Sequence, residues 1–170
     1  MSAATDLPPA RVLRRAPLDT LPYDVVVLRH DERLLRRRRL VTAHGEGFLV
    51  DLSATSGLDQ GDAFELEDGR LVEVMAAEEP LLEVRGPDLP RLAWHLGNRH
   101  APCQIERDRL LIQRDHVLRD MLARLGAGVR EVSEAFIPEG GAYGYGRTMG
   151  HDHFGGELGQ LATHVPGHGG

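Results

Sequence analysis

The chain has 170 residues, enough for one domain or two small ones, and its 41% hydrophobic residues can form an apolar core. The formal net charge of −6 argues against a nucleic-acid-binding protein, and no apolar run approaches the roughly 20 residues that cross a bilayer. The first ten residues lack the basic and apolar regions of a signal peptide, so we expect a cytoplasmic protein with no nucleic-acid or membrane partner.

The first half of the chain has the pattern of short β-strands. Residues 1–10 are polar and proline-rich, which predicts a loose N-terminus. Between residues 11 and 80, β-branched and apolar runs alternate with turn signals and no helical period appears, so we expect an all-β domain. Asp68 and Gly69 predict a hairpin with a type I′ turn. The expected strands are Tyr23–Arg29, Leu34–Ala43, Gly47–Leu52, Asp62–Leu66 and Leu71–Ala76.

The second half, over residues 81–149, adds two helical patterns. Asp88 can cap a helix that ends at Gly97, and Asp115 can cap one that ends at Gly126. The expected elements in chain order are a strand at Leu81–Arg85, the first helix, strands at Cys103–Glu106 and Arg109–Gln113, a helix at His116–Leu125 and a strand at Val129–Ile137. This β-α-β-β-α-β order predicts a ferredoxin-like sandwich with both helices on one sheet face, and the fold class is α+β.

In the last part of the chain, hydrophobic residues no longer recur at a regular spacing. Eleven of the twenty glycines lie between Gly140 and Gly170, so we expect residues 150–170 to form a flexible tail. This tail contains His151, His153, His164 and His168.

Histidine carries the strongest chemical signal, because seven of the nine histidines lie at or after His95. Imidazole suits nickel, zinc, copper and iron. His100 follows a helix end and is a rigid candidate ligand. His116 opens the second helix, whose positive end favours a neutral imidazole. One rigid ligand and several mobile ones would suit a site completed by a second subunit, with His100 contributed twice across a two-fold axis.

Other interpretations of the same residues stay open. His116 could equally be a capping or packing residue, and the tail histidines could simply be solvated. Cys103 is expected to be a buried, unreactive side chain, and as a single cysteine it excludes an internal disulfide. The run Arg36–Arg39 lies in a predicted strand, where it is either a solvated sheet face or a docking surface for an acidic partner or peptide. A metal-dependent hydrolase is the least favoured function, since no carboxylate is spaced as a general base beside the histidines.

Several stretches resemble the UreE family of urease accessory proteins. They are Leu92–His100 (LAWHLGNRH), Leu110–Leu118 (LLIQRDHVL), Pro138–Gly144 (PEGGAYG) and the following His151 and His153. Upstream, Val72–Glu79 (VEVMAAEE) and Leu82–Val84 (LEV) are also similar, so the match covers most of residues 11–153.

The resemblance implies a nickel metallochaperone, not an enzyme, that delivers Ni(II) as cargo to urease during assembly of the urease active site. It implies a β domain like the peptide-binding domains of chaperones and a homodimer formed by the ferredoxin-like domain. His100 would be the interface ligand from each subunit, and His151 and His153 would add ligands from the tail. The implied partners are the urease apoprotein and the GTPase urease accessory protein.

Two further expectations concern the metal. His116 matches the second histidine of a His-x-His found in some members of the family, and Arg114 replaces the first, so a peripheral metal site is not expected to be complete. Zn(II) and Cu(II) should also bind, because imidazole sites hold them at least as well as Ni(II). The alternative to a nickel carrier is a β-domain interaction module in urease maturation whose metal binding is incidental.

Overall fold

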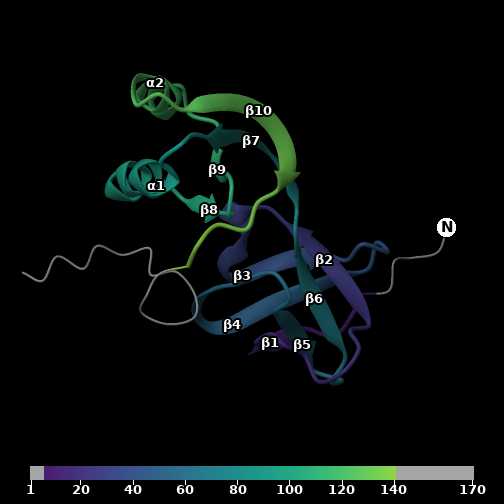
Figure 1. Cartoon of the computed structure of the whole chain (residues 1–170). Coiled ribbons are helices and arrows are strands. Elements are labelled where there is room, and N and C mark those ends of the chain that lie inside the picture. Colours follow the sequence, from purple (N-terminus) through teal and green to yellow (C-terminus); the bar gives the residue numbers. More distant parts are fainter. Residues whose placement is uncertain (1–5, 141–170) are drawn as a thin grey trace, which may run out of the picture.

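The computed structural model describes residues 6–140, which form two β-sheets (Figure 1). The first sheet has six strands in the order β2-β6-β5-β1-β4-β3. Its strands are β1 (Ala10–Arg14), β2 (Asp24–Leu28), β3 (Leu34–Val41), β4 (Gly47–Gly57), β5 (Ala63–Leu66) and β6 (Leu71–Ala76). A short 3-10 helix, η1 (His30–Arg33), connects β2 to β3. Apolar side chains from all six strands pack into one core, as the all-β prediction requires.

The predicted loose N-terminus is wrong for residues 7–10. Leu7 is buried, its N–H donates to the Gly47 carbonyl over 2.8 Å, and Ala10 begins β1 with no exposed surface. Strand β1 lies between β4, with which it runs parallel, and β5, with which it runs antiparallel. Burial of Leu7 and Ala10 in the core therefore orders a segment whose composition is typical of a loose end.

The predicted hairpin of β5 and β6 is present, but its turn type differs. The two strands pair antiparallel, and Gly69 has a positive φ of 88°. Asp68 does not share that conformation, and the Gly69 N–H donates to the Leu66 carbonyl over 2.8 Å. A type I′ turn needs positive φ at both central residues, so this is a type I turn followed by a left-handed glycine.

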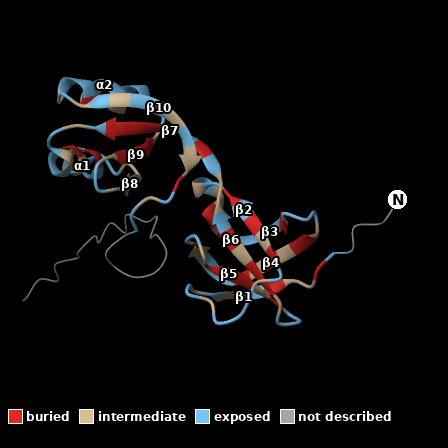
Figure 2. Ribbon diagram, turned by 45° about the vertical axis from the view of Figure 1, so that its right-hand side comes forward, coloured by how far each residue is buried: buried red, intermediate tan, exposed pale blue. Residues whose placement is uncertain are grey.

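The second sheet confirms the ferredoxin-like prediction. Its elements are β7 (Glu78–Arg85), α1 (Leu89–Asn98), β8 (Cys103–Ile105), β9 (Leu110–Gln113), α2 (His116–Arg124) and β10 (Gly128–Ala135). The strand order β10-β7-β9-β8 has every neighbouring pair antiparallel. Leu82 and Val84 of β7 pack against Leu92 and Leu96 of α1 and Leu122 of α2, so both helices cover one face. Figure 2 shows the opposite, outward sides of these helices as exposed.

A single residue, Ala77, separates the two sheets along the chain, and the predicted boundary between residues 80 and 81 lies inside β7. Buried polar groups join the sheets at this junction. An Arg33 guanidinium nitrogen donates to the Phe136 carbonyl over 2.6 Å and lies 3.9 Å from the Glu79 carboxylate. The Glu79 carboxylate also accepts from the His30 N–H over 2.9 Å.

Between residues 6 and 140 we find no helix with the length and apolarity that a membrane span requires.

Candidate metal-binding site

His100 sits at the end of α1 in a backbone conformation that L residues rarely adopt. Asp88 caps the start of the helix by accepting from the Arg91 N–H, as predicted. At the other end, the His100 N–H donates to the Gly97 carbonyl over 3.0 Å and the Ala101 N–H to the Leu96 carbonyl over 3.2 Å. These two bonds form a Schellman motif, and its left-handed position, where glycine is usual, holds His100 with φ of 56°.

The predicted helix end at Gly97 is therefore wrong. Gly97 remains inside the helix, which continues through Asn98 with Arg99 as its C-cap. Leu96 and Ala101, which close the Schellman motif, both belong to the core of the second domain. Their packing decides where the helix ends, because an interior glycine costs a helix only about 1 kcal/mol.

The surface of the helix that ends at His100 combines exposed apolar and basic groups. The His100 residue is itself exposed, and 64% of Trp94 on α1 is exposed. The Trp94 ring makes an edge contact with the His95 ring, with centroids 5.0 Å apart. A groove of about 440 Å³ runs between the last turn of α1 and α2. It is lined by His95, Arg99, Val117, Asp120, Met121, Arg124 and Leu125.

His116 is the first residue of α2, as the sequence predicted, and its side chain is exposed. Asp115 caps the helix by accepting from the Leu118 N–H over 2.9 Å. His116 lines a shallow pocket of about 330 Å³ with Arg114, Arg119 and Glu131. Both guanidinium groups pair with the Glu131 carboxylate, at 3.6 and 3.3 Å. The pocket contains two arginine side chains that share the Glu131 carboxylate, and these positive charges disfavour a bound metal ion.

The remaining predicted ligands, His151, His153, His164 and His168, lie outside the described residues. Within residues 6–140, no three His, Cys, Asp or Glu side chains are grouped closely enough to hold a metal ion. Cys103 is only partly buried, and not fully buried as expected, but this burial still raises the pKa of its thiol to about 11, so the sulfur stays protonated at neutral pH. Within residues 6–140, His100 therefore belongs to no group of side chains that could hold a metal ion by itself.

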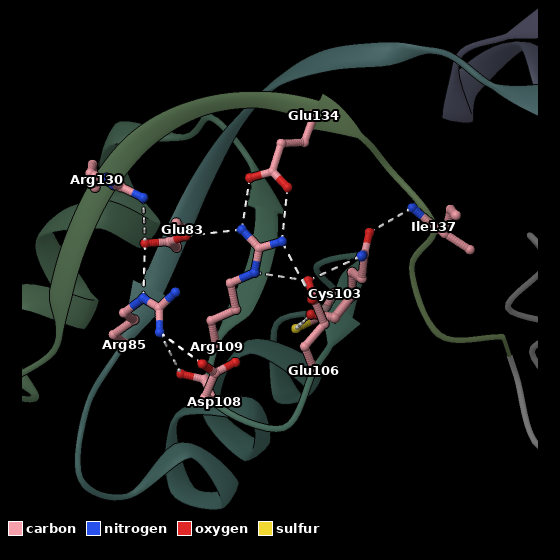
Figure 3. Close-up of polar contacts among 10 residues, drawn as sticks. Glu83, Arg85, Cys103, Glu106, Asp108, Arg109, Arg130, Glu134 and Ile137 are labelled. Atoms are coloured by element: carbon pink, nitrogen blue, oxygen red, sulfur yellow. Dashed lines mark hydrogen bonds and ion pairs between the residues drawn. The ribbon is translucent and has the colours of Figure 1, made fainter.

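A charged network that the sequence did not predict covers the sheet face opposite the helices (Figure 3). Glu83 of β7 is 4% exposed, and its carboxylate accepts from Arg85, Arg109 and Arg130 at 2.9–3.1 Å. These arginines lower the pKa of Glu83 to about 2. Arg109 also forms a bidentate pair with Glu134, at 2.7 and 2.8 Å. The network joins β7 and β10 to Arg109, the residue before β9, and so supports the sheet on which the helices pack.

The Arg36–Arg39 run lies in β3 at the edge of the first sheet, and all four side chains are exposed. This position agrees with both interpretations of the run, a solvated face or a docking surface.

Comparison with known proteins places the whole chain in one family. Residues 4–77 match the model of the UreE urease accessory protein N-terminal domain, and residues 79–169 match that of its C-terminal domain. The chain is 62% identical to a urease accessory protein UreE of Ruegeria pomeroyi over 87% of this chain and 99% of that one. It is 61% identical to the Cereibacter sphaeroides protein of that name over 88% and 82% of the two chains. For the Bradyrhizobium protein of that name the identity is 49%, over 84% and 71%. The chain therefore belongs to the UreE family of urease accessory proteins, and its role is in urease maturation.

Proposed function

We propose that the protein is a metallochaperone that binds Ni(II) as cargo through His100 and delivers it to urease in the cytoplasm. The observation that carries this proposal is the left-handed backbone of His100 at the end of α1. A non-glycine residue in this conformation costs on the order of 1 kcal/mol, and such strain is concentrated at functional sites. Glycine would adopt this conformation without strain, so we infer that histidine is present here because its imidazole has a function.

A single imidazole holds a metal ion weakly, so the proposed site needs a second subunit. In the homodimer that we propose, two copies of His100 meet at a two-fold axis and share one Ni(II). Support comes from the apolar surface on the two helices, where Trp94 is 64% and Val117 61% exposed. Trp94 contacts His95, and His95 lines one groove with Val117, so these apolar groups adjoin as they do on surfaces that bind another protein.

We propose that His151 or His153 completes the nickel coordination, and that His164 and His168 are secondary ligands. His116 would be at most a weak ligand, because Arg114 and Arg119 lie beside it and repel a metal cation. Zn(II) and Cu(II) should bind to the same imidazoles, because the donor type does not discriminate against them. The proposed partners that receive the metal are the urease apoprotein and the GTPase urease accessory protein. The charge of −6 supports the absence of a nucleic-acid partner, and we propose no catalytic role.

Nickel titration by calorimetry, combined with light scattering on the same sample, tests this proposal. We expect one tightly bound Ni(II) per dimer and its loss in His100→Ala, while the dimer mass stays unchanged. His95→Ala is the matched control, because His95 belongs to the same helix end, and it should retain full nickel binding. Nickel binding that survives His100→Ala and disappears on truncation after Gly150 would instead make the tail the binding element and overturn the interface site.

The exposed arginines of the edge strand β3 favour a second function, protein interaction by the N-terminal domain, which is compatible with nickel transport.

A further inference from the structure

We propose that Gln104 is a positioning residue for nickel binding, because it fixes the chain after β10 beside the connection from α1 to β8 that carries His100. The histidines further along the chain then start close to the metal. This inference rests on the proposed function, in which His100 and one of His151 and His153 bind the same Ni(II). The contacts that support it all lie within residues 6–140.

After β10 the chain crosses the width of the second sheet. β10 and β8 are the two edge strands of this sheet, with β7 and β9 between them. Neighbouring strands lie about 4.8 Å apart, so three spacings separate β10 from β8 by about 14 Å. Residues 136–139 cover this distance, and Figure 1 shows the chain turning from the end of β10 towards β8. We call these residues the crossing segment.

Phe136 fixes the first half of the crossing. Its side chain is fully buried and packs with Leu81 of β7 and Leu111 of β9. These two leucines lie on the sheet face opposite the helices, because they alternate along their strands with residues that pack on α1 and α2. Burial of an apolar ring therefore carries the chain over the two middle strands, whether or not it contacts β8.

Hydrogen bonds to β8 fix the second half of the crossing. The Ile137 N–H, labelled in Figure 3, donates to the Gln104 side-chain oxygen over 2.8 Å. The Gln104 side-chain nitrogen donates to the Glu106 carboxylate over 3.3 Å, which orients the amide. The Glu139 N–H then donates to the Cys103 carbonyl over 2.8 Å. The Ile137 side chain is 40% exposed, so its burial does not explain why the chain stays on β8.

These hydrogen bonds place the end of the crossing segment near His100. Cys103 follows His100 by three residues, which span at most about 11 Å. His151 lies twelve residues after Glu139, and a chain of that length reaches at most about 40 Å. A chain held only at Phe136, over the middle of the sheet, would start about 7 Å further from β8 and have three more residues free to move.

Both changes lower the concentration of the tail histidines around the metal. The effective concentration of a tethered ligand falls when its tether starts further away and when it samples a larger volume. The amide of Gln104 therefore strengthens nickel binding without touching the metal.

A double-mutant cycle on the full-length protein tests the proposal, with nickel affinity measured by competition with a chelator. Gln104→Met removes the amide and keeps the length of the side chain. We expect it to weaken nickel binding about threefold in the otherwise unchanged protein. It should have no effect in the H151A/H153A background, where the ligands to be positioned are absent. A purely structural role of Gln104 would give the same loss in both backgrounds.

Two control variants separate the hydrogen bond from other effects of the substitution. In Q104E/E106Q the carboxylate at position 104 can accept from the Ile137 N–H and from the amide at position 106, so nickel affinity should return to the wild-type value. Gln113→Met makes the same change at the end of β9 and should leave nickel affinity unchanged. Hydrogen exchange of the Ile137 amide should become faster in Gln104→Met and in neither control.

Four results would overturn the proposal. Unchanged hydrogen exchange at Ile137 in Gln104→Met would show that Gln104 does not hold the crossing segment. Faster exchange with unchanged nickel affinity would show that the segment has no influence on the metal. An equal loss of affinity in both backgrounds would leave Gln104 a structural role and the proposed nickel function intact. Unchanged affinity in H151A/H153A alone would contradict both this inference and the proposed tail ligands.

Discussion

The conformation of His100 combines two requirements that a sequence rarely satisfies together. The Schellman motif at the end of α1 needs a residue with positive φ, and the proposed metal site needs an imidazole at this position. Histidine satisfies the second requirement and fits the first poorly, because its Cβ crowds the following carbonyl. Stability and the proposed function therefore oppose each other at a single residue.

His100→Gly should stabilise the metal-free protein by up to about 1 kcal/mol, because glycine adopts the left-handed conformation without strain. The same change should abolish nickel binding. Urea denaturation of the metal-free protein, followed by circular dichroism, measures the first effect, and nickel titration measures the second. His100→Ala is the comparison, since it loses the imidazole but keeps the strain and should show no gain. A lower stability of His100→Gly would contradict our account of this helix end.

The sequence predicted His100 as a candidate ligand after a helix, but it could not predict its backbone conformation. The single-residue signal was Gly97, which is typical of a helix end. The actual end depends on Ala101, which packs with Leu96 in the core. Such packing involves residues that come together only when the sheet forms, so the local pattern misplaced the left-handed residue by three positions.

At the scale of the elements, the strands of the second domain are joined by charged side chains as well as by apolar contacts. Glu83 is nearly inaccessible to solvent and still ionised, because three guanidinium groups surround it. The sequence showed only that Glu83 is a polar residue between Leu82 and Val84 in a predicted strand. Two of its partners, Arg109 and Arg130, are distant along the chain, so the alternating pattern alone does not indicate that Glu83 is buried among arginines.

Glu83→Gln should lower the free energy of unfolding at pH 7, on the order of 2 kcal/mol, because ionised Glu83 stabilises the fold. The folded-state pKa of about 2 lies below the value of about 4.3 for an exposed glutamate. The contribution of Glu83 is therefore complete above pH 4.3 and is lost as the pH falls towards 2. We expect the stability gap between wild type and variant to narrow as the pH falls from about 4.3 towards 2, with part of this loss already present at pH 3, measured by urea denaturation.

Glu131→Gln is the control for this experiment, because Glu131 pairs with Arg114 and Arg119 at the exposed surface. Its effect should stay below about 0.5 kcal/mol at every pH. A gap between wild type and Glu83→Gln that is the same at pH 7 and pH 3 would contradict the role assigned to Glu83.

For the whole molecule, a small buried group of contacts among η1, β7 and the segment after β10 holds the two sheets together. Arg33 of η1 bonds to the carbonyl that follows β10, and Glu79 of β7 lies beside it. The Phe136 ring is fully buried and makes an edge contact with the His30 ring, with centroids 5.6 Å apart. These contacts, together with the one-residue connection at Ala77, hold the N-terminal sheet against the ferredoxin-like domain.

Arg33→Ala should destabilise the protein by about 3–5 kcal/mol, because it leaves the buried Glu79 carboxylate without its cation. Glu79→Gln should cost less, since the amide oxygen can still accept from the His30 N–H. Urea denaturation of both variants gives the two values, and hydrogen exchange should show lost protection near Phe136 in Arg33→Ala. A loss below about 1 kcal/mol in Arg33→Ala would show that the sheets are held by other contacts.

The capping and turn residues of the sequence predicted the order of helices and strands along the chain. They did not predict which strands lie side by side in the first sheet. The order of strands and helices in the second domain followed from two aspartate caps, Gly126 and the apolar spacing. The six-stranded order of the first sheet could not be predicted, because β1 pairs with β4 and β2 with β6 across intervening strands. Parallel pairs of this kind leave no turn signal in the sequence.

The helix end at His100 has a consequence for selection experiments. A library screened only for melting temperature or soluble yield would favour glycine at this position and would score the resulting loss of nickel binding as an improvement. Engineering of this chain towards robustness therefore needs a metal-dependent readout in every round, or it will select against the residue that we propose as the ligand.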